Sequence, residues 1–377
     1  MSETILKNGL VFTPDRVFER LDLSFDNGII TGTEKDIRRP GNIIDCRGKY
    51  VIPGLTDVHL HGCGGADVCD GTQLALETVC RSELSHGVTT VCPATMTLPD
   101  ERLKKVLRCA ADFAGSRRKS NGDMSEIVGL HLEGPFISRE KCGAQDGRYV
   151  QFPSAGKLRE YQNCAGGLIK LVTIAPELDG AVKMIKELSG QLHFSLGHTS
   201  TDHENATAAF CAGADHVTHL FNAMPPLHHR GPGLIGAAAD TEECFAELIC
   251  DGVHVSPSAV RAAFKLFPGR IVLISDSMEA AGMADGEYML GGQKVYKTGA
   301  KAVLKDGTLA GSVSTLYDCM VNAVRMGISL EDAISSATIV PCRSIGIDKC
   351  FGSLEVGKRA DILITDMDLR LERVIKS

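Results

Sequence analysis

Between about residues 51 and 345, short apolar runs alternate with longer helix-like segments. Helical periodicity marks the segments 73–86, 100–114, 179–189, 202–212 and 256–267. Such alternation is typical of βα units and a parallel sheet. The apolar runs are GLTDVHLH, GVTTVCPAT, IVGLHLEG, IKLVTIAPE, LHFSLGHT, HVTHLFNA, AELICDGVH and RIVLISDS. Eight strands close a (β/α)8 barrel, so we expect a TIM-like α/β fold. A doubly wound open sheet fits less well, because we find no Gly-rich dinucleotide turn after the first run.

The two ends of the chain share a different pattern. Residues 1–50 contain short alternating segments with Asn8-Gly9 and Asn27-Gly28, which are strong hairpin signals. The C-terminal stretch GSLEVGKRADILITD returns to this pattern. We therefore predict a small β-sandwich domain formed by residues 1–50 and 346–377, with the barrel at 51–345. A hairpin-like insert near 287–311 and helices near 313–326 and 330–340 should follow the eighth strand.

Composition narrows the functional classes. The chain has 377 residues and a net charge of -7, with 44% hydrophobic and 23% charged residues, which is typical of globular proteins. No apolar run approaches the roughly 18 residues of a membrane helix, and the N-terminus lacks the pattern of a secretory signal. The mildly acidic balance argues against a nucleic-acid surface. The 14 cysteines are scattered and form no C-x-x-C, so we expect free thiols in a reducing cytoplasm.

Reactive side chains of such barrels sit where the strands end. The ends of six of the eight runs carry a metal ligand or an acid: His59 and His61 in the first, Glu133 in the third, His198 in the fifth, His219 in the sixth, His254 in the seventh and Asp276 in the eighth. A lone His in a barrel is usually a packing residue, and His131, which precedes its strand end, should pack inside. Independent residues have little reason to fill six strand ends in this way. The joint pattern therefore indicates a metal site.

The ligand types indicate the chemistry. Imidazole and carboxylate without a thiolate cluster suit Zn²⁺ or Fe²⁺ and disfavour an iron–sulfur centre. Strand periodicity places His59 and His61 on one face, as a shared metal requires. Three firm ligands with an open position are typical of a hydrolytic site. Asp276, if it stays unligated, can accept a proton from water and deliver it to a leaving amine.

Several motifs resemble those of a known family. P-G-L-T-D-V-H-L-H-G at 53–62 resembles the opening metal motif of the amidohydrolase superfamily. The segments 129–138 (G-L-H-L-E-G-P-F-I-S), 195–199 (S-L-G-H-T), 218–227 (T-H-L-F-N-A-M-P-P-L), 251–254 (D-G-V-H) and 307–312 (G-T-L-A-G-S) resemble N-acetylglucosamine-6-phosphate deacetylases. The resemblance extends over nearly the whole chain, including the split β domain.

The resemblance implies roles for individual residues. Glu133, His198 and His219 match firm metal ligands, His59 and His61 match a second metal position, and Asp276 matches the catalytic acid/base. One or two divalent metals per subunit are implied, with Zn²⁺ favoured and Fe²⁺, Mn²⁺ or Co²⁺ as alternatives. A cytoplasmic homodimer acting on a phosphorylated amino sugar is also implied. The implied substrate contacts are Ala144, Gln145, Asn222, Ala223, Arg230 (for the phosphate), His254, Leu309, Ala310 and Gly311.

Two departures from the family pattern touch substrate recognition. Gln145 stands where a substrate-contacting His is usual, and Gly231 replaces a more usual acidic residue. N-acetylglucosamine 6-phosphate is the expected substrate, and N-acetylgalactosamine 6-phosphate or another N-acetylated sugar is the alternative. A dihydroorotase-like cyclic-amide hydrolase would need a carboxylated Lys at the end of the fourth strand, whereas Lys170 lies at its start. A scaffold without activity would be expected to lack a ligand, and every ligand is present.

Overall fold

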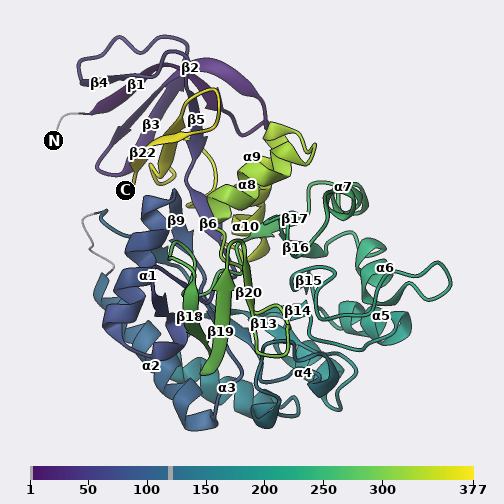
Figure 1. Ribbon diagram of the computed structural model, residues 1–377. Helices are drawn as coiled ribbons and strands as arrows, with labels where there is room; N and C mark the ends of the chain where they lie inside the picture. The colour runs from purple at the N-terminus through teal and green to yellow at the C-terminus, as the bar shows by residue number, and fades with distance from the viewer. Residues whose placement is uncertain (1–2, 118–121) are drawn as a thin grey trace.

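The computed structural model describes residues 3–117 and 122–377, so residues 1–2 and 118–121 of the predicted segments lie outside the described residues. The predicted (β/α)8 barrel is confirmed, and it lies below a smaller sheet that holds both ends of the chain (Figure 1). In the described part of the chain the barrel strands are β6 (Leu55–Asp57), β9 (Val88–Val91), β12 (Leu130–Glu133), β13 (Ile169–Ile174), β14 (His193–Leu196), β15 (His216–Val217), β16 (Phe245–Ile249) and β17 (Ile271–Ile274).

Parallel pairing runs in chain order around the barrel. β6 pairs with β9, and β12 to β17 follow one another in a single sheet. Two short strands complete the junction between them, because β10 (Ala94–Thr95) pairs with β12 and β11 (Glu126–Ile127) pairs with β9. The ring closes just beyond β17, where the Asp276 amide donates to the His59 carbonyl at 2.9 Å and the His61 amide donates to the Ser277 carbonyl at 2.8 Å.

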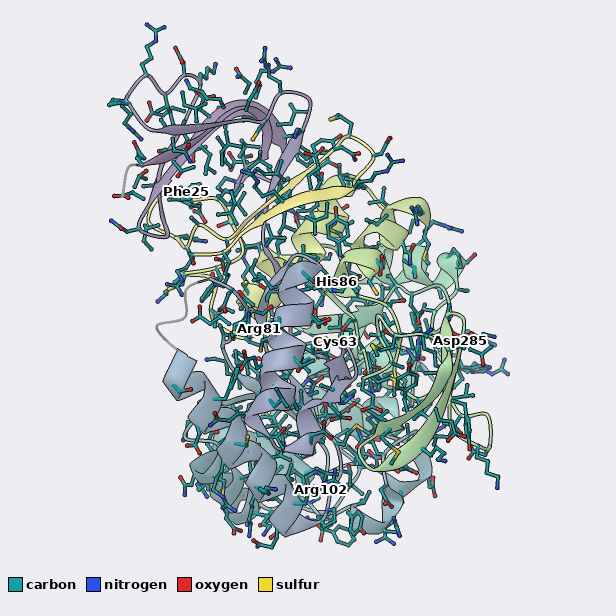
Figure 2. All side chains as sticks on the ribbon, turned by 60° about the vertical axis from the view of Figure 1, so that its left-hand side comes forward. Phe25, Cys63, Arg81, His86, Arg102 and Asp285 are labelled. Atoms are coloured by element: carbon teal, nitrogen blue, oxygen red, sulfur yellow. The ribbon has the colours of Figure 1, made fainter. Side chains whose placement is uncertain are left out.

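Helices pack outside the strands, and a three-stranded insert follows β17 (Figure 1). Most helices fall within a few residues of the predicted segments, while α3 and α6 were not predicted. The helices are α1 (Gln73–Ser85), α2 (Asp100–Arg117), α3 (Ala155–Cys164), α4 (Ala181–Leu188), α5 (His203–Cys211), α6 (Gly233–Ala239), α7 (Pro257–Leu266), α8 (Leu316–Arg325), α9 (Leu330–Ala337) and α10 (Ile339–Ser344), with 3-10 turns η1 (Val68–Asp70), η2 (Arg139–Lys141) and η3 (Gly147–Tyr149). The insert consists of β18 (Gly286–Leu290), β19 (Gln293–Thr298) and β20 (Lys301–Val303), and a small hairpin joins β7 (Gly62–Cys63) to β8 (Ala66–Asp67). Figure 2 shows Asp285 beside this insert, on the side of the barrel away from Phe25 in the terminal sheet.

The barrel interior has a polar layer beneath the strand ends. The outward side chains of the strands, such as Phe194 and Leu248, are fully buried under the helices. Inside, His131 Nε2 lies 2.7 Å from Thr173 Oγ1, and Thr173 Oγ1 lies 2.8 Å from Thr218 Oγ1. Burial holds the pKa of His131 down to about 3, so this imidazole is neutral and structural, as predicted. Hydrogen bonding satisfies these buried groups and supports the residues above them.

The terminal sheet draws on both ends of the chain. Its order is β22-β21-β5-β1-β2-β3, with β4 paired to β1. It branches at β1, whose first half pairs with β4 and whose second half pairs with β5, so the predicted separate β domain is present as one branched sheet. The strands described are β1 (Thr4–Phe12), β2 (Phe18–Asp26), β3 (Ile29–Glu34), β4 (Asn42–Asp45), β5 (Tyr50–Pro53), β21 (Ile362–Thr365) and β22 (Leu371–Ile375).

Two further expectations can be compared with the structure. All 14 cysteines lie in the described ranges and are free thiols, as expected. Among the helices of residues 3–117 and 122–377, none combines the length and the apolar character that crossing a membrane requires.

Candidate metal centre and substrate pocket

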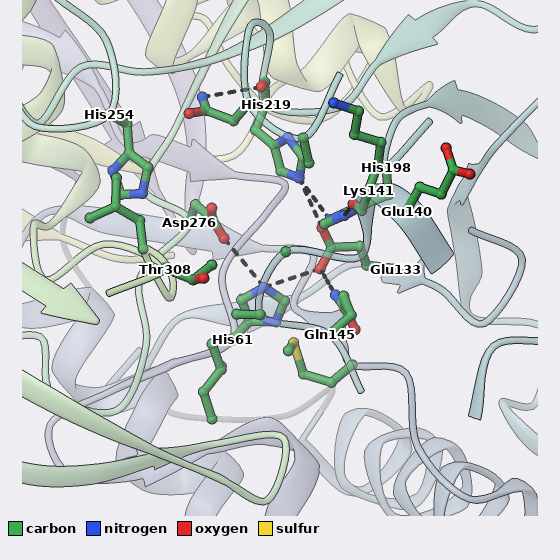
Figure 3. Close-up of a pocket in the computed structure, with 18 residues that line it drawn as sticks. His61, Glu133, Glu140, Lys141, Gln145, His198, His219, His254, Asp276 and Thr308 are labelled. Carbon is green, nitrogen blue, oxygen red and sulfur yellow. Dashed lines mark hydrogen bonds and ion pairs between the residues drawn. The ribbon is translucent and has the colours of Figure 1, made fainter. Parts of the chain in front are cut away.

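A pocket of about 360 Å³ opens at the carboxyl ends of the barrel strands, which is where this fold usually places its reactive groups. Figure 3 shows its centre, with His61, Glu133, His198, His219 and Asp276 converging on one space. The pocket is lined by His61, Met96, Glu133, Glu140, Lys141, Gly143, Ala144, Gln145, His198, His219, Asn222, Ala223, His254, Asp276, Leu290, Thr308, Leu309 and Gly311.

Glu133, His198 and His219 form the first cluster. Glu133 ends β12, and its Oε1 lies 3.0 Å from His198 Nε2 and 3.2 Å from His219 Nε2. The two Nε2 atoms lie 3.1 Å apart. Ligand atoms about 2.0–2.1 Å from a tetrahedral zinc stand about 3.3 Å from one another. The three atoms are therefore already spaced almost as ligands of one ion.

His59, His61 and Asp276 form the second cluster beside it. Asp276 Oδ1 lies 3.3 Å from His61 Nε2 and 3.6 Å from His59 Nε2. Glu133 joins the two clusters, because its Oε2 lies 3.2 Å from His61 Nε2 and its Oε1 lies 3.4 Å from His59 Nε2. The carboxylate can thus face two ions at once.

Buried partners orient the imidazoles. Glu247, in the middle of β16, accepts a hydrogen bond from His59 Nδ1 at 2.8 Å and another from the His219 amide at 3.2 Å. The Lys141 carbonyl accepts from His198 Nδ1 at 2.8 Å. The bonds to His59 and His198 occupy Nδ1 and leave Nε2 available to a metal, which is how metal-binding histidines are usually held, while the bond to His219 holds its backbone.

Charge inside the cluster determines its ionisation. Burial would raise the pKa of Glu133, but the charge of His59 and hydrogen bonds from His198 and His219 hold that pKa well below its usual range. At Asp276, burial alone would also raise the pKa, but the hydrogen bond from His61 and the charge of the nearby imidazoles lower it to about 2. Both carboxylates are therefore ionised at neutral pH and attract cations.

The backbone at these positions is unusual. His198, His219 and Asp276 have φ values of 48°, 28° and 48°, in the left-handed region that residues with a Cβ rarely adopt. Such conformations cost about 1–3 kcal/mol each and are concentrated at functional sites. Gly311 packs closely against the backbone of Asp276, since a Cβ at position 311 would stand 3.0 Å from the Asp276 carbonyl oxygen.

The donor set fits a divalent metal. His59 Nε2 is buried, lies 3.4 Å from Glu133 Oε1 and 3.6 Å from Asp276 Oδ1, and has no hydrogen-bond partner among the described residues. Four imidazoles and two ionised carboxylates in one buried space form two clusters, His59–His61–Asp276 and Glu133–His198–His219, with spacing that suits an ion. A buried nitrogen left without a partner is costly unless an ion or water completes it. Nitrogen and oxygen ligands of this kind suit a divalent transition metal.

The remaining predicted residues divide into two groups. Ala144, Gln145, Asn222, Ala223, His254, Leu309 and Gly311 line the pocket, whereas Ala310 is fully buried behind it. Arg230, predicted to contact the phosphate, does not line the pocket of its own chain. It lies on an exposed surface loop before α6, with Nη1 2.9 Å from His229 Nε2.

Sequence reasoning missed two contributors. Glu247 is fully buried, and the only available signal was an acidic residue inside an apolar strand run, AELIC. Lys141 lines the pocket and is the only Lys or Arg among the described lining residues. Figure 3 shows its side chain extending past His219 while the Glu140 carboxylate points away. Nothing in the sequence distinguishes Lys141 from an ordinary loop cation.

The fold and this site define a hydrolase built on a (β/α)8 barrel, with a cluster at the strand ends that suits a divalent metal. A family model described as "Amidohydrolase family" matches residues 50–376. The chain belongs to the amidohydrolase family and, within it, to the family of N-acetylglucosamine-6-phosphate deacetylases.

Individual relatives cover almost the entire chain. The N-acetylglucosamine-6-phosphate deacetylase of Bacillus subtilis (strain 168) is 35% identical over 382 residues, spanning 98% of this chain and 94% of the relative. The N-acetylgalactosamine-6-phosphate deacetylase of Escherichia coli O157:H7 is 31% identical over 372 residues, spanning 98% and 97%. A mutant N-acetyl-D-glucosamine-6-phosphate deacetylase from Mycobacterium smegmatis, solved in complex with N-acetyl-D-glucosamine-6-phosphate, matches with a TM-score of 0.92 at 31% identity and covers 100% of this chain and 98% of that chain.

Proposed function

We propose that this protein hydrolyses the acetamide of N-acetyl-D-glucosamine 6-phosphate to D-glucosamine 6-phosphate and acetate, in the cytoplasm and as a step of amino-sugar catabolism. The observation that carries the proposal is the strand-end cluster of Glu133, His198 and His219 with ionised Asp276 beside it, inside a pocket of about 360 Å³. That volume suits a small ligand. Deacetylases of phosphorylated amino sugars among its relatives supply the substrate class.

The metal in this proposal is Zn²⁺, with Fe²⁺, Mn²⁺ and Co²⁺ as alternatives, held by Glu133, His198 and His219, with His59 and His61 at a second position. A divalent metal bound there supplies Lewis-acid polarisation of the amide carbonyl and makes water acidic enough to react near neutral pH. Asp276 holds the attacking water and takes its proton, because its lowered pKa keeps it ionised. It then returns that proton to the departing amine nitrogen.

Lys141 and His254 are the cations proposed for the phosphate. Lys141 lines the pocket. Burial alone would lower the pKa of His254, but its hydrogen bond to Asp251 outweighs this effect and raises the pKa, which favours the charged imidazole. Arg230 lies on an exposed loop, so we assign it a contact with the phosphate across the interface of a homodimer. Asn222, Ala223, Leu309 and Gly311 surround the sugar in this arrangement, with Ala144 and Gln145 on the opposite loop.

Release of acetate tests the proposal directly. Purified protein loaded with Zn²⁺ is assayed with N-acetylglucosamine 6-phosphate, N-acetylgalactosamine 6-phosphate and unphosphorylated N-acetylglucosamine. We expect the first substrate to give the highest kcat/KM. A higher kcat/KM for N-acetylgalactosamine 6-phosphate would make that compound the proposed substrate instead, in line with the name of the Escherichia coli relative. No acetate from any of the three would refute it.

The cyclic-amide alternative receives no support from the site geometry. It requires a Lys at the carboxyl end of the fourth barrel strand, close to both metals. Lys170 is the second residue of β13 and lies at the opposite end of that strand from the pocket. Glu133 is the carboxylate in a position to serve both clusters.

A further inference from the structure

The side chain of Gln145 is held inside the pocket wall. It follows η2 in the loop between β12 and α3, is 4% exposed, and its backbone amide donates to the Cys142 carbonyl at 2.9 Å. The sequence predicted a direct contact between this side chain and the substrate. Its hydrogen bonds point to another partner.

The orientation of the Gln145 amide is unambiguous. The backbone N–H of Thr97 can only donate, and it lies 2.6 Å from Gln145 Oε1, so that atom is the carbonyl oxygen. The NH2 group therefore faces Glu133, and Gln145 Nε2 donates to Glu133 Oε2 at 2.7 Å. Figure 3 shows this contact on the side of Glu133 away from His219. In the reversed orientation, the Gln145 NH2 group would face the Thr97 N–H and the Gln145 carbonyl oxygen would face the Glu133 carboxylate, and neither pair could form a hydrogen bond.

We infer that Gln145 is a positioning residue that fixes the Glu133 carboxylate for metal binding. The inference rests on the proposed metal site. With one lone pair of Oε2 bonded to the amide, the carboxylate is held against rotation, and Oε1 stays 3.0–3.2 Å from His198 Nε2 and His219 Nε2. The other lone pair of Oε2 remains directed toward His61, 3.2 Å away. Gln145 thus links the fixed backbone of Thr97 to the one carboxylate that both clusters share.

The two possible roles of Gln145 predict different behaviour. A residue that only contacts substrate affects KM and leaves metal affinity unchanged. A residue that positions a ligand affects metal affinity before any substrate is present, and removing such partners typically costs about 10–100-fold in metal affinity. Excess metal then restores turnover in the second case alone.

A hydrogen bond from β19 to the same loop offers a matched control. Gln293, in β19, donates from Nε2 to the carbonyl oxygen of Ala144, the residue before Gln145. Gln293→Leu removes a side-chain amide bond made to this loop and leaves the bond between Gln145 and Glu133 in place. Gln145→Met is the second variant at the site, since an unbranched chain of similar length fills the space if the Leu variant folds poorly.

The experiment titrates metal-free, full-length protein with Zn²⁺ against a chromophoric chelator, and measures kcat/KM at limiting and saturating Zn²⁺. For Gln145→Leu or Gln145→Met we expect about 10–100-fold weaker Zn²⁺ binding, with kcat/KM restored by saturating Zn²⁺ to within about threefold of wild type. Gln293→Leu should bind Zn²⁺ as wild type does. Unchanged Zn²⁺ affinity in the folded Gln145 variants, with a raised KM, overturns the inference and leaves the proposed function intact. A wild-type protein that binds no Zn²⁺, Fe²⁺, Mn²⁺ or Co²⁺ overturns both.

Discussion

Replacing Glu247 with Gln removes one negative charge from beneath the metal cluster while preserving the volume of the side chain. Glu247 is fully buried, and its Oε2 accepts from His59 Nδ1 at 2.8 Å and from the His219 amide at 3.2 Å. A Gln carbonyl oxygen can take the same place and accept both bonds. Its NH2 group then occupies the position of Oε1, 3.9 Å from His131 Nδ1.

The magnitude follows from the loss of charge. Hydrogen bonds to charged groups contribute about 1.5–3 kcal/mol and neutral ones about 0.5–1.5 kcal/mol, so the variant should lose about 1–1.5 kcal/mol. This corresponds to about 5- to 15-fold weaker metal binding. The loss should fall on the metal equivalent that His59 holds, because the imidazole becomes a poorer ligand when its Nδ1–H faces a neutral oxygen.

Chelator competition on metal-free protein measures each equivalent separately. Glu243→Gln, the same change at an exposed position near the start of β16, is the matched control and should bind metal as wild type does. Glu247→Leu, which leaves two buried donors unsatisfied, should weaken metal binding more and also lower Tm. If folded Glu247→Gln binds every equivalent as tightly as wild type, Glu247 does not orient His59 for a metal and the reasoning fails.

Further outcomes are expected for five single variants. His198→Ala should abolish metal binding at the Glu133 cluster and activity together while the far-ultraviolet circular dichroism spectrum is retained; full occupancy by elemental analysis would contradict the assignment. His59→Asn should remove a second metal equivalent that wild type binds, and a single equivalent in both proteins would argue for one ion. Asp276→Asn should retain metal and lose about 10²–10⁴-fold in kcat, the usual contribution of general acid–base catalysis, so near-normal turnover would exclude the role. Lys141→Met should raise KM for the phosphorylated sugar about 10–100-fold, as the loss of a charged hydrogen bond requires, and should barely affect unphosphorylated N-acetylglucosamine. Arg230→Ala should have the same effect only if the protein is a dimer at the assay concentration. Equal effects of a variant on both sugars would refute a phosphate contact by that residue.

The barrel was predicted from the local pattern of hydrophobic residues, and this pattern was less informative for elements that are short or unusual in composition. The apolar runs and helical periodicities located the strands because buried parallel strands are nearly continuous in hydrophobic residues. α6 was missed, since its sequence GLIGAAA contains two glycines and lacks a polar face. β15 is only two residues long, and His216–Val217 was located from the motif around it rather than from its own pattern.

The site residues likewise divide into those that local sequence spacing could predict and those whose contacts depend on the folded barrel. His59 and His61 lie just beyond β6, two residues apart, and their Nε2 atoms lie 3.6 Å and 3.3 Å from Asp276 Oδ1, so sequence spacing alone could predict their common direction. Glu247 lies 28 residues beyond His219, and its hydrogen bond to His59 joins strands that meet only when the barrel closes. The positions of Arg230 and Lys141 relative to the pocket depend on how two long loops run over the barrel, which residue type cannot specify.

The shared terminal sheet has a consequence for synthesis on the ribosome. β1, β2, β3, β4 and β5 leave the exit tunnel first, but β21, the antiparallel neighbour of β5, is translated only after the whole barrel. Until then one edge of β5 is unpaired, and Val51 lacks the Ile362 and Ile364 side chains that complete its hydrophobic cluster. Open apolar edges of this kind pair readily with other chains. A nascent or truncated chain that lacks β21 therefore exposes one edge of β5, and pairing with β21 covers that edge and completes the hydrophobic cluster around Val51.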